Sequence, residues 1–107
     1  MTALEALANQ PDAARVDEKA RSLLDDPDPM VRSRAVSVVA FWARPGALVT
    51  LSPLAQDSVP HVRMILGWCL GGLRDQAAEP ILRGLLADPD EQVRAFAARG
   101  LGRLNRQ

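Results

Sequence analysis

The residues of this chain that could perform chemistry are few, and they lie apart in the sequence. Among its 107 residues there is one cysteine, Cys69, and one histidine, His61. The histidine has no cysteine, aspartate or serine at a spacing typical of a catalytic dyad or triad. One cysteine and one histidine also cannot form the usual zinc cluster. The sequence therefore predicts that the chain is not an enzyme and that it holds neither a metal nor a cofactor.

Aspartates and arginines, by contrast, recur at a fixed spacing. Three Val-Arg pairs stand 31 residues apart, and one aspartate precedes each pair by the same distance. A partly buried contact between an arginine and a carboxylate must be satisfied in place, so we expect these charges to stabilise the fold rather than to catalyse a reaction. The aspartates are Asp26, Asp57 and Asp88, and the arginines are Arg32, Arg63 and Arg94.

A 31-residue period over most of a chain predicts an array of helical hairpins, each too small to bury its own apolar face. We expect an all-α fold in a single domain over 1–107, with repeats at about 12–44, 45–75 and 76–107. In each repeat a first helix, the A helix, leads through a turn into a second helix, the B helix. The repeated aspartate falls in that turn, and the repeated arginine falls in the B helix.

Local signals indicate where these helices begin and end. Asp88 can cap the third B helix, and Glu91 completes a capping-box pattern. Pro53 falls inside the second A helix and is expected to bend or break it, because its ring opposes the carbonyl four residues earlier. The segment 2–9 is predicted to form an additional short helix over the first repeat, which gives seven helices in all.

The endings of the later B helices indicate a family. The second ends in Cys-Leu-Gly-Gly-Leu at 69–73, and the third ends in Gly-Leu-Gly-Arg-Leu at 100–104. Together with the repeated Asp and Val-Arg positions, these endings resemble HEAT repeats. The short period is similar to the bacterial subtype that was first named for phycobilisome lyases. The resemblance covers about 12–104 and implies a right-handed α-solenoid.

The resemblance also implies roles for the repeated charges. In this family the turn aspartate and the B-helix arginine form a ladder of hydrogen bonds from repeat to repeat, so we expect Arg63 to pair with Asp57 or with Asp26. Solenoids need a polar cap at their ends, and the sequence shows one clearly only at its amino end. Association with a second copy through the uncapped carboxyl-terminal repeat is therefore left open.

Solenoids of this kind bind partners on the concave face that their B helices line. This face is the side of each B helix that points away from the core, which we call the outward face. In the first B helix we expect it to carry Ser33, Ser37 and Phe41. Trp68 takes the position that Ser37 and Arg99 take in the neighbouring repeats, so the period does not explain it as a core residue. The alternative is that Trp68 folds back as peripheral core. The predicted partner-binding residues are Phe41, Met64, Trp68, Arg99 and Arg103.

Two other residues are expected to lie inside. Trp42 aligns with Leu73 and Leu104, so the period predicts that it belongs to the core. Cys69 falls on the inward side of its helix, where we expect a small buried residue rather than a nucleophile. A single cysteine also excludes an internal disulfide and fits a reducing compartment, so we expect a cytoplasmic protein. No run of the sequence approaches the ~18 apolar residues of a membrane span, so we do not expect it to enter the membrane.

The formal net charge is zero, but its distribution is uneven. Residues 1–31 hold seven acids against three bases, whereas the sequence from Arg94 onward holds four arginines and no acid. Overall neutrality disfavours a dedicated nucleic-acid binder, which normally has a net basic face. The opposed ends could favour head-to-tail contact between copies, although a solvated basic face is the simpler interpretation.

Three functions compete on these observations. The leading hypothesis is a non-enzymatic scaffold that binds a protein or peptide on the concave face. The second is binding of a nucleic-acid backbone by arginines of the B helices, with Trp68 stacking on a base. The third, which rests only on the resemblance, is an accessory subunit of a larger lyase-type enzyme. The arginines of the second hypothesis are Arg34, Arg99, Arg103 and Arg106.

Overall fold

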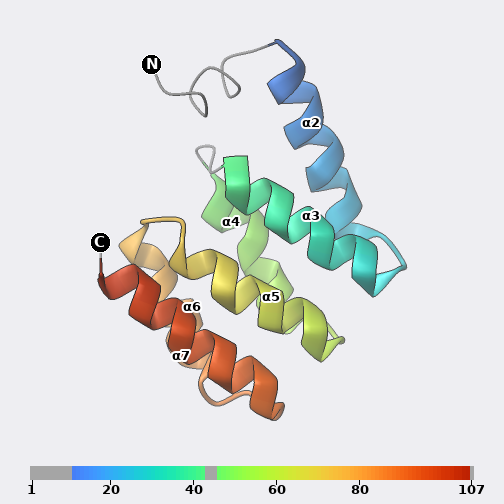
Figure 1. The fold of residues 1–107 in the computed structure, drawn as a ribbon. Helices are drawn as coiled ribbons and strands as arrows, with labels where there is room; N and C mark the ends of the chain where they lie inside the picture. The colour runs from blue at the N-terminus through green and yellow to red at the C-terminus, as the bar shows by residue number, and fades with distance from the viewer. Residues whose placement is uncertain (1–10, 43–45, 107) are drawn as a thin grey trace.

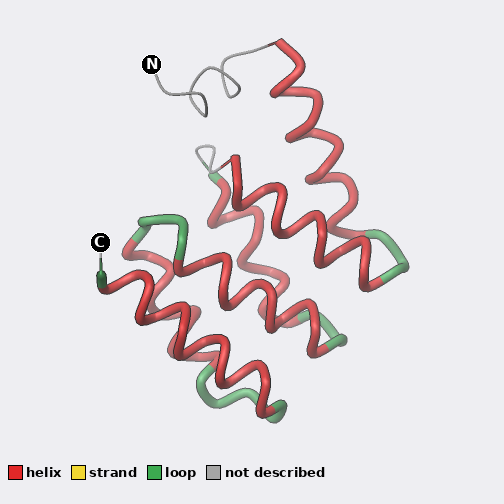
Figure 2. Tube along the Cα trace, in the orientation of Figure 1, coloured by secondary structure: helices red, strands yellow, loops and turns green. Residues whose placement is uncertain are grey.

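The computed structural model describes residues 11–42 and 46–106, which form three helical hairpins (Figure 1). Helices and the turns between them account for all of the described residues, which confirms the all-α prediction (Figure 2). In the described part there are six α-helices, and the helix predicted over 2–9 lies outside it. In chain order the elements are α2 Pro11–Ser22, η1 Leu23–Asp25, α3 Pro29–Trp42, α4 Ala47–Leu51, η2 Ser52–Gln56, α5 Pro60–Gly71, η3 Gln76–Ala78, α6 Glu79–Leu85 and α7 Glu91–Asn105.

Prolines and aspartates set the limits of these helices. Pro53 lies at the start of η2, so α4 ends at Leu51 and the second A helix continues as 3-10 helix. The residue that caps α7 is Asp90, whose carboxylate accepts two backbone N–H groups of the first turn at 2.8 and 3.1 Å. The prediction that Asp88 caps this helix was therefore wrong, because Asp88 lies two residues too early and closes the preceding turn instead.

The helices form two layers in a flat body that measures 41 × 34 × 18 Å. The B helices α3, α5 and α7 lie side by side at the front of Figure 1, and α4 and α6 lie behind them. Because α5 packs against α3 on one side and α7 on the other, it is the central helix of the B layer. No helix in the described ranges is long and apolar enough to span a membrane. The largest fully buried side chains are Val36, Val39, Leu51, Val62, Leu66, Leu70, Leu82, Val93 and Leu104.

Glycines allow α5 and α7 to approach each other closely. A β-carbon at Gly71 would overlap the backbone of Gly100, and one at Gly100 would overlap the carbonyl oxygen of Gly67. A β-carbon at Gly67 would stand 3.4 Å from Cα of Ala97, which is close to an ordinary van der Waals contact. Gly71 and Gly100 therefore serve the packing of one repeat on the next, since only a residue without a side chain fits at these two positions.

Two predictions about burial in α3 were wrong. Ser33 was expected on the outward face but is only 4% exposed, and its equivalent Met64 packs on residues of the repeat that follows it. Trp42 was expected in the core but is half-buried, and its ring meets that of Phe41 edge to face, with centroids 5.6 Å apart. The equivalent Leu104 of α7 is fully buried, so the period predicted the helix face of Trp42 but not how completely its ring is covered.

Candidate functional site

The three turns that join A and B helices share one hydrogen-bond pattern. In each turn the carboxylate of the repeated aspartate accepts the backbone N–H two residues later at 2.9 Å. An aspartate at this place closes the turn with its own side chain. The pattern leaves further acceptor positions on the carboxylate for a partner from another repeat. The three aspartates are Asp26, Asp57 and Asp88.

Two of the repeated arginines bridge neighbouring repeats. Arg32 donates from Nε and Nη2 to the two carboxylate oxygens of Asp57 at 2.8 and 3.0 Å. Arg63 makes the same two hydrogen bonds to Asp88 at 2.7 and 3.0 Å. The Nη1 atom of each arginine donates to the carbonyl oxygen of the aspartate in its own turn, at 2.9 Å for Arg32 and 2.6 Å for Arg63. Each guanidinium therefore joins its own turn to the turn of the next repeat.

The direction of this pairing differs from the expectation. The carboxylate that Arg63 holds is that of Asp88 in the following repeat, not that of Asp57 or Asp26. Within the described residues the ladder has two such pairs, and one charged group is left over at each end. Within 11–42 and 46–106 no guanidinium contacts the carboxylate of Asp26, which accepts the backbone N–H of Asp28, and Arg94 donates there to backbone carbonyl oxygens of its own turn.

The two pairs are largely sheltered from water. The exposed fractions of the side chains are 14% and 8% for Arg32 and Asp57, and 12% and 7% for Arg63 and Asp88. Burial raises the pKa of Asp57, but hydrogen bonds from Arg32 and the N–H of Val59 outweigh it and hold this pKa below its ordinary value. The hydrogen bond from Arg63 is the main cause that lowers the pKa of Asp88. These carboxylates are therefore charged at neutral pH.

Trp68 lies on the outward side of α5 and is 41% exposed. The guanidinium carbon of Arg103, on α7, stands 4.0 Å from the centre of a Trp68 ring. Nη1 of Arg103 also donates to the carbonyl oxygen of Trp68 at 2.9 Å. Gly72 makes room for this arrangement, since a β-carbon there would stand 2.6 Å from Nη2 of Arg103. The two side chains thus form a stacked pair that links α5 to α7.

Of the other predicted binding residues, Phe41 and Arg99 are exposed and Met64 is not. Phe41, at the end of α3, is 59% exposed. Arg99 is exposed on α7, with its guanidinium carbon 5.0 Å from the centre of the Phe96 ring. Met64 lies elsewhere: it is half-buried and packs on a small apolar cluster of α6 and α7. Sequence reasoning missed Phe96, although its alignment with Ile65 and its spacing from Arg99 place it beside this face.

The charges of the B helices are mostly positive. In the described B helices α3 and α5 contain no acidic residue, and Glu91 is the single acid of α7. Because Arg32 and Arg63 are paired with aspartates, the surplus comes from other arginines, of which Arg34 and Arg99 are exposed. The outward side of the B layer therefore combines exposed aromatic rings with an excess of positive charge.

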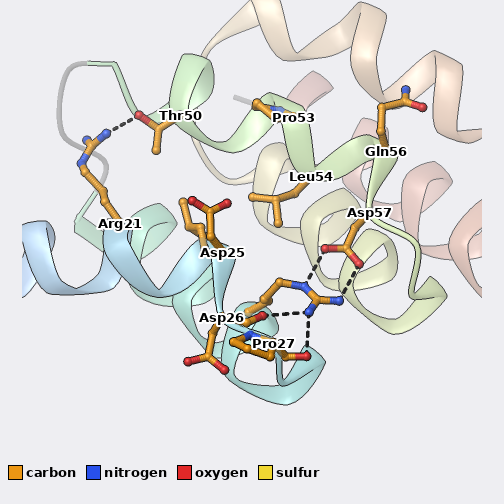
Figure 3. A pocket seen from close by; sticks show the side chains of 11 residues that line it. Arg21, Asp25, Asp26, Pro27, Thr50, Pro53, Leu54, Gln56 and Asp57 are labelled. Atoms are coloured by element: carbon orange, nitrogen blue, oxygen red, sulfur yellow. Dashed lines mark hydrogen bonds and ion pairs between the residues drawn. The ribbon is translucent and has the colours of Figure 1, made fainter.

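A cavity of about 570 Å³ lies beside the Arg32–Asp57 pair, between the A helices of the first two repeats (Figure 3). At its rim Arg21 contacts the hydroxyl of Thr50. Figure 3 shows the carboxylate of Asp26 pointing away from the guanidinium that Asp57 binds. The charged groups around the cavity are thus engaged mainly with the protein itself, and they do not converge on a common centre.

The residues considered for chemistry are not brought together. His61 is exposed, while Cys69 is half-buried and packs against the core. Burial raises the pKa of the Cys69 thiol, and a hydrogen bond with Ser37 and the charge of Arg103 oppose this rise only in part. Within residues 11–42 and 46–106 no group of three or more His, Cys, Asp and Glu side chains could hold a metal ion.

Comparison with known proteins agrees with this geometry. A family model described as HEAT repeats matches residues 18–102, a range that includes all three turns and both Arg–Asp pairs. Deoxyhypusine hydroxylase from Gallus gallus is 35% identical over 85 residues. The aligned part is 77% of this chain but only 28% of that protein, so the chain spans little more than a quarter of the length of this relative.

This relative corrects one prediction. The chain was expected not to be an enzyme, but deoxyhypusine hydroxylase is an enzyme by its name, and it contains a segment similar to most of this chain. The expectation rested on the scarcity of cysteine and histidine. That scarcity argues against a catalytic dyad or triad and against a zinc cluster. It does not decide whether helical repeats of this type belong to a catalytic protein.

Proposed function

Because this chain belongs to the HEAT-repeat family, we propose that it is a protein-interaction scaffold. The proposed binding surface is the outward side of the B helices, centred on Trp68 and Arg103, and the partner is a protein or peptide segment. The observation that carries the proposal is a tryptophan that is 41% exposed while an arginine fixes its position. Exposed tryptophan and arginine side chains supply much of the binding energy at protein interfaces.

The charges of this surface favour an acidic partner. Arg34, Arg99 and the stacked Arg103 belong to the same helices that carry or flank the exposed rings, and the only acid of the described B helices is Glu91, at the start of α7. A segment that carries carboxylates on both sides of an apolar or aromatic side chain would complement both features. Charge complementarity of this kind raises the rate of association and selects against wrong partners.

Binding of a nucleic-acid backbone is the second candidate for the same arginines. Two observations count against it. Arg103 already lies over the indole of Trp68, which a base would need for stacking, and the chain has no net positive charge. The dependence of affinity on salt separates the two candidates, because phosphate binding falls steeply and log-linearly with salt concentration.

The test uses a random-peptide display library selected against the immobilised chain. We expect the selected peptides to carry an aromatic or large apolar residue next to Asp or Glu. Trp68→Ala should lower their affinity more than about tenfold, as expected for a hot-spot residue. Arg99→Glu should slow association, most visibly at low salt.

The matched control is Arg83→Gln on α6, in the other layer. Arg83 is exposed and forms an ion pair within its own helix, with Glu79 at 2.8 Å. This variant should bind the selected peptides as the native chain does. Peptides that bind the native chain and Trp68→Ala equally well, or that lose binding with Arg83→Gln, would show that the surface is wrongly chosen.

Two further parts of the proposal concern where and with what the protein works. A cytoplasmic location fits a chain whose single cysteine forms no internal disulfide. Self-association through the carboxyl-terminal repeat is a second mode of interaction, separate from the surface around Trp68.

A further inference from the structure

The two ends of the Arg–Asp ladder carry complementary groups. Arg94 uses Nη1 on carbonyl oxygens of its own turn, as Arg32 does in the first repeat. Arg32 uses its Nε and Nη2 atoms to hold a carboxylate. Within the described ranges, the Nε and Nη2 atoms of Arg94 contact no carboxylate. At the other end Asp26 accepts a backbone N–H in its turn, as Asp57 does, but no guanidinium within 11–42 or 46–106 contacts it.

The helix faces beside these two groups are also less covered than their equivalents elsewhere. On the side toward the next repeat, Gly67 of α5 is buried, whereas the equivalent Ala98 of α7 is exposed. On the side toward the preceding repeat, Val31 of α3 is half-buried, whereas the equivalent Val62 of α5 is fully buried. Between repeats, the forward side of one B helix packs on the backward side of the next. The forward side of α7 and the backward side of α3 are the two surfaces of this kind that are less covered.

We propose that the carboxyl-terminal repeat docks on the first repeat of a second copy, with Arg94 of one copy holding Asp26 of the next. The internal pairs provide the pattern for this contact, since the same fork meets the same turn at 2.7–3.0 Å inside the chain. The charges of the two ends are complementary as well. Residues 1–31 carry seven acids against three bases, and the sequence from Arg94 onward carries four arginines and no acid.

Such a contact is head-to-tail, because it joins different surfaces of the two copies. A head-to-tail contact does not saturate at a dimer but continues into a chain of copies or closes into a ring. This inference deepens the self-association part of the proposed function. It does not depend on the surface around Trp68, so the two can fail separately.

The test follows the mass of the assembly against concentration by analytical ultracentrifugation. For the native chain we expect the mass to rise beyond that of a dimer. Arg94→Met and Asp26→Asn should each weaken association at least tenfold, and the asparagine keeps the oxygen that closes the turn. An equimolar mixture of the two variants should form dimers and nothing larger, because each variant retains one working end and together they build one native contact.

A third variant guards against local damage to the turn. Ala98→Arg adds a long side chain on the exposed side of α7 and removes no hydrogen bond, yet it should block association as strongly as Arg94→Met. Trp68→Ala should associate as the native chain does. The proposal is overturned if the native chain stays monomeric up to about 1 mM, if Ala98→Arg associates normally, or if the mixture of variants remains monomeric.

Discussion

Helix α5 has two sides that obey different rules. The side that faces α7 carries Arg63, which recurs in every repeat, and Gly71, which lets the backbones touch. The outward side carries Trp68, at a position where the neighbouring repeats have Ser37 and Arg99. The comparison suggests that residues which follow the period hold the repeats together, whereas the residue that breaks it on the open side is the better candidate for recognition.

The largest expected loss of stability comes from a substitution on the side of α5 that packs against α7. Gly71→Ala places a β-carbon against the backbone of Gly100, and backbone atoms cannot move aside as the end of a flexible side chain can. We expect the free energy of unfolding to fall by about 3 kcal/mol, at the upper end of the usual cost of overpacking. Urea unfolding followed by circular dichroism measures this change.

Gly84→Ala is the matched control for that substitution. Gly84 also lies within a helix, α6, but a β-carbon there would meet nothing within 4 Å. Alanine should therefore stabilise the chain by up to ~1 kcal/mol through its higher helix propensity. If both alanines changed stability equally, the close approach of α5 and α7 would have no energetic weight.

The next effect concerns the ladder. Arg63→Met removes the guanidinium that joins two turns and leaves the sheltered carboxylate of Asp88 without its partner. The free energy of unfolding should fall by about 1–3 kcal/mol, while binding by the folded variant is retained. The exposed pair of Arg83 and Glu79 is the comparison, and Arg83→Gln should cost less than about 0.5 kcal/mol. Unchanged stability with lost binding in Arg63→Met would reverse the assignment.

The Arg–Asp pairs should also make the stability of the chain depend on pH in the acid range, and this effect is smaller. The pKa values of Asp57 and Asp88 are lowered in the folded chain, so their contribution to stability is complete above the ordinary carboxyl pKa of about 4. It is lost as the pH falls from there toward the folded-state pKa values, because the unfolded chain then binds more protons. The urea midpoint should decline in this range, and the decline should be shallower in Arg63→Met. An equally steep decline in that variant would remove Asp88 from the account.

Much of the fold could be predicted because the period is itself a physical constraint. Equivalent residues 31 apart must occupy equivalent places if each repeat packs on the next, so helix pairs and turn aspartates follow from the sequence. Pro53 could be placed as a helix breaker because its effect is local: the ring fixes φ, removes the N–H donor and clashes with the carbonyl four residues earlier.

The period could not fix how each helix is rotated about its own axis. A B helix of this chain contacts the core and one or two neighbouring repeats, so its buried arc is wider than the apolar stripe of a surface helix. Ser33 and Met64 were for this reason placed on the open side, although both lie toward the next repeat. The same uncertainty hid the direction in which Arg63 reaches, and only the geometry of the stack identifies Asp88 as its partner.

The most direct test of the account is the affinity of folded Trp68→Ala for a peptide selected on the native chain. The stability of this variant should fall by no more than about 1 kcal/mol, the scale of an exposed cation–π contact such as that with Arg103, so calorimetry can be done on folded protein. We predict that affinity falls more than about tenfold. An unchanged affinity, or a loss of stability as large as that of Arg63→Met, would contradict the assignment of Trp68 to recognition.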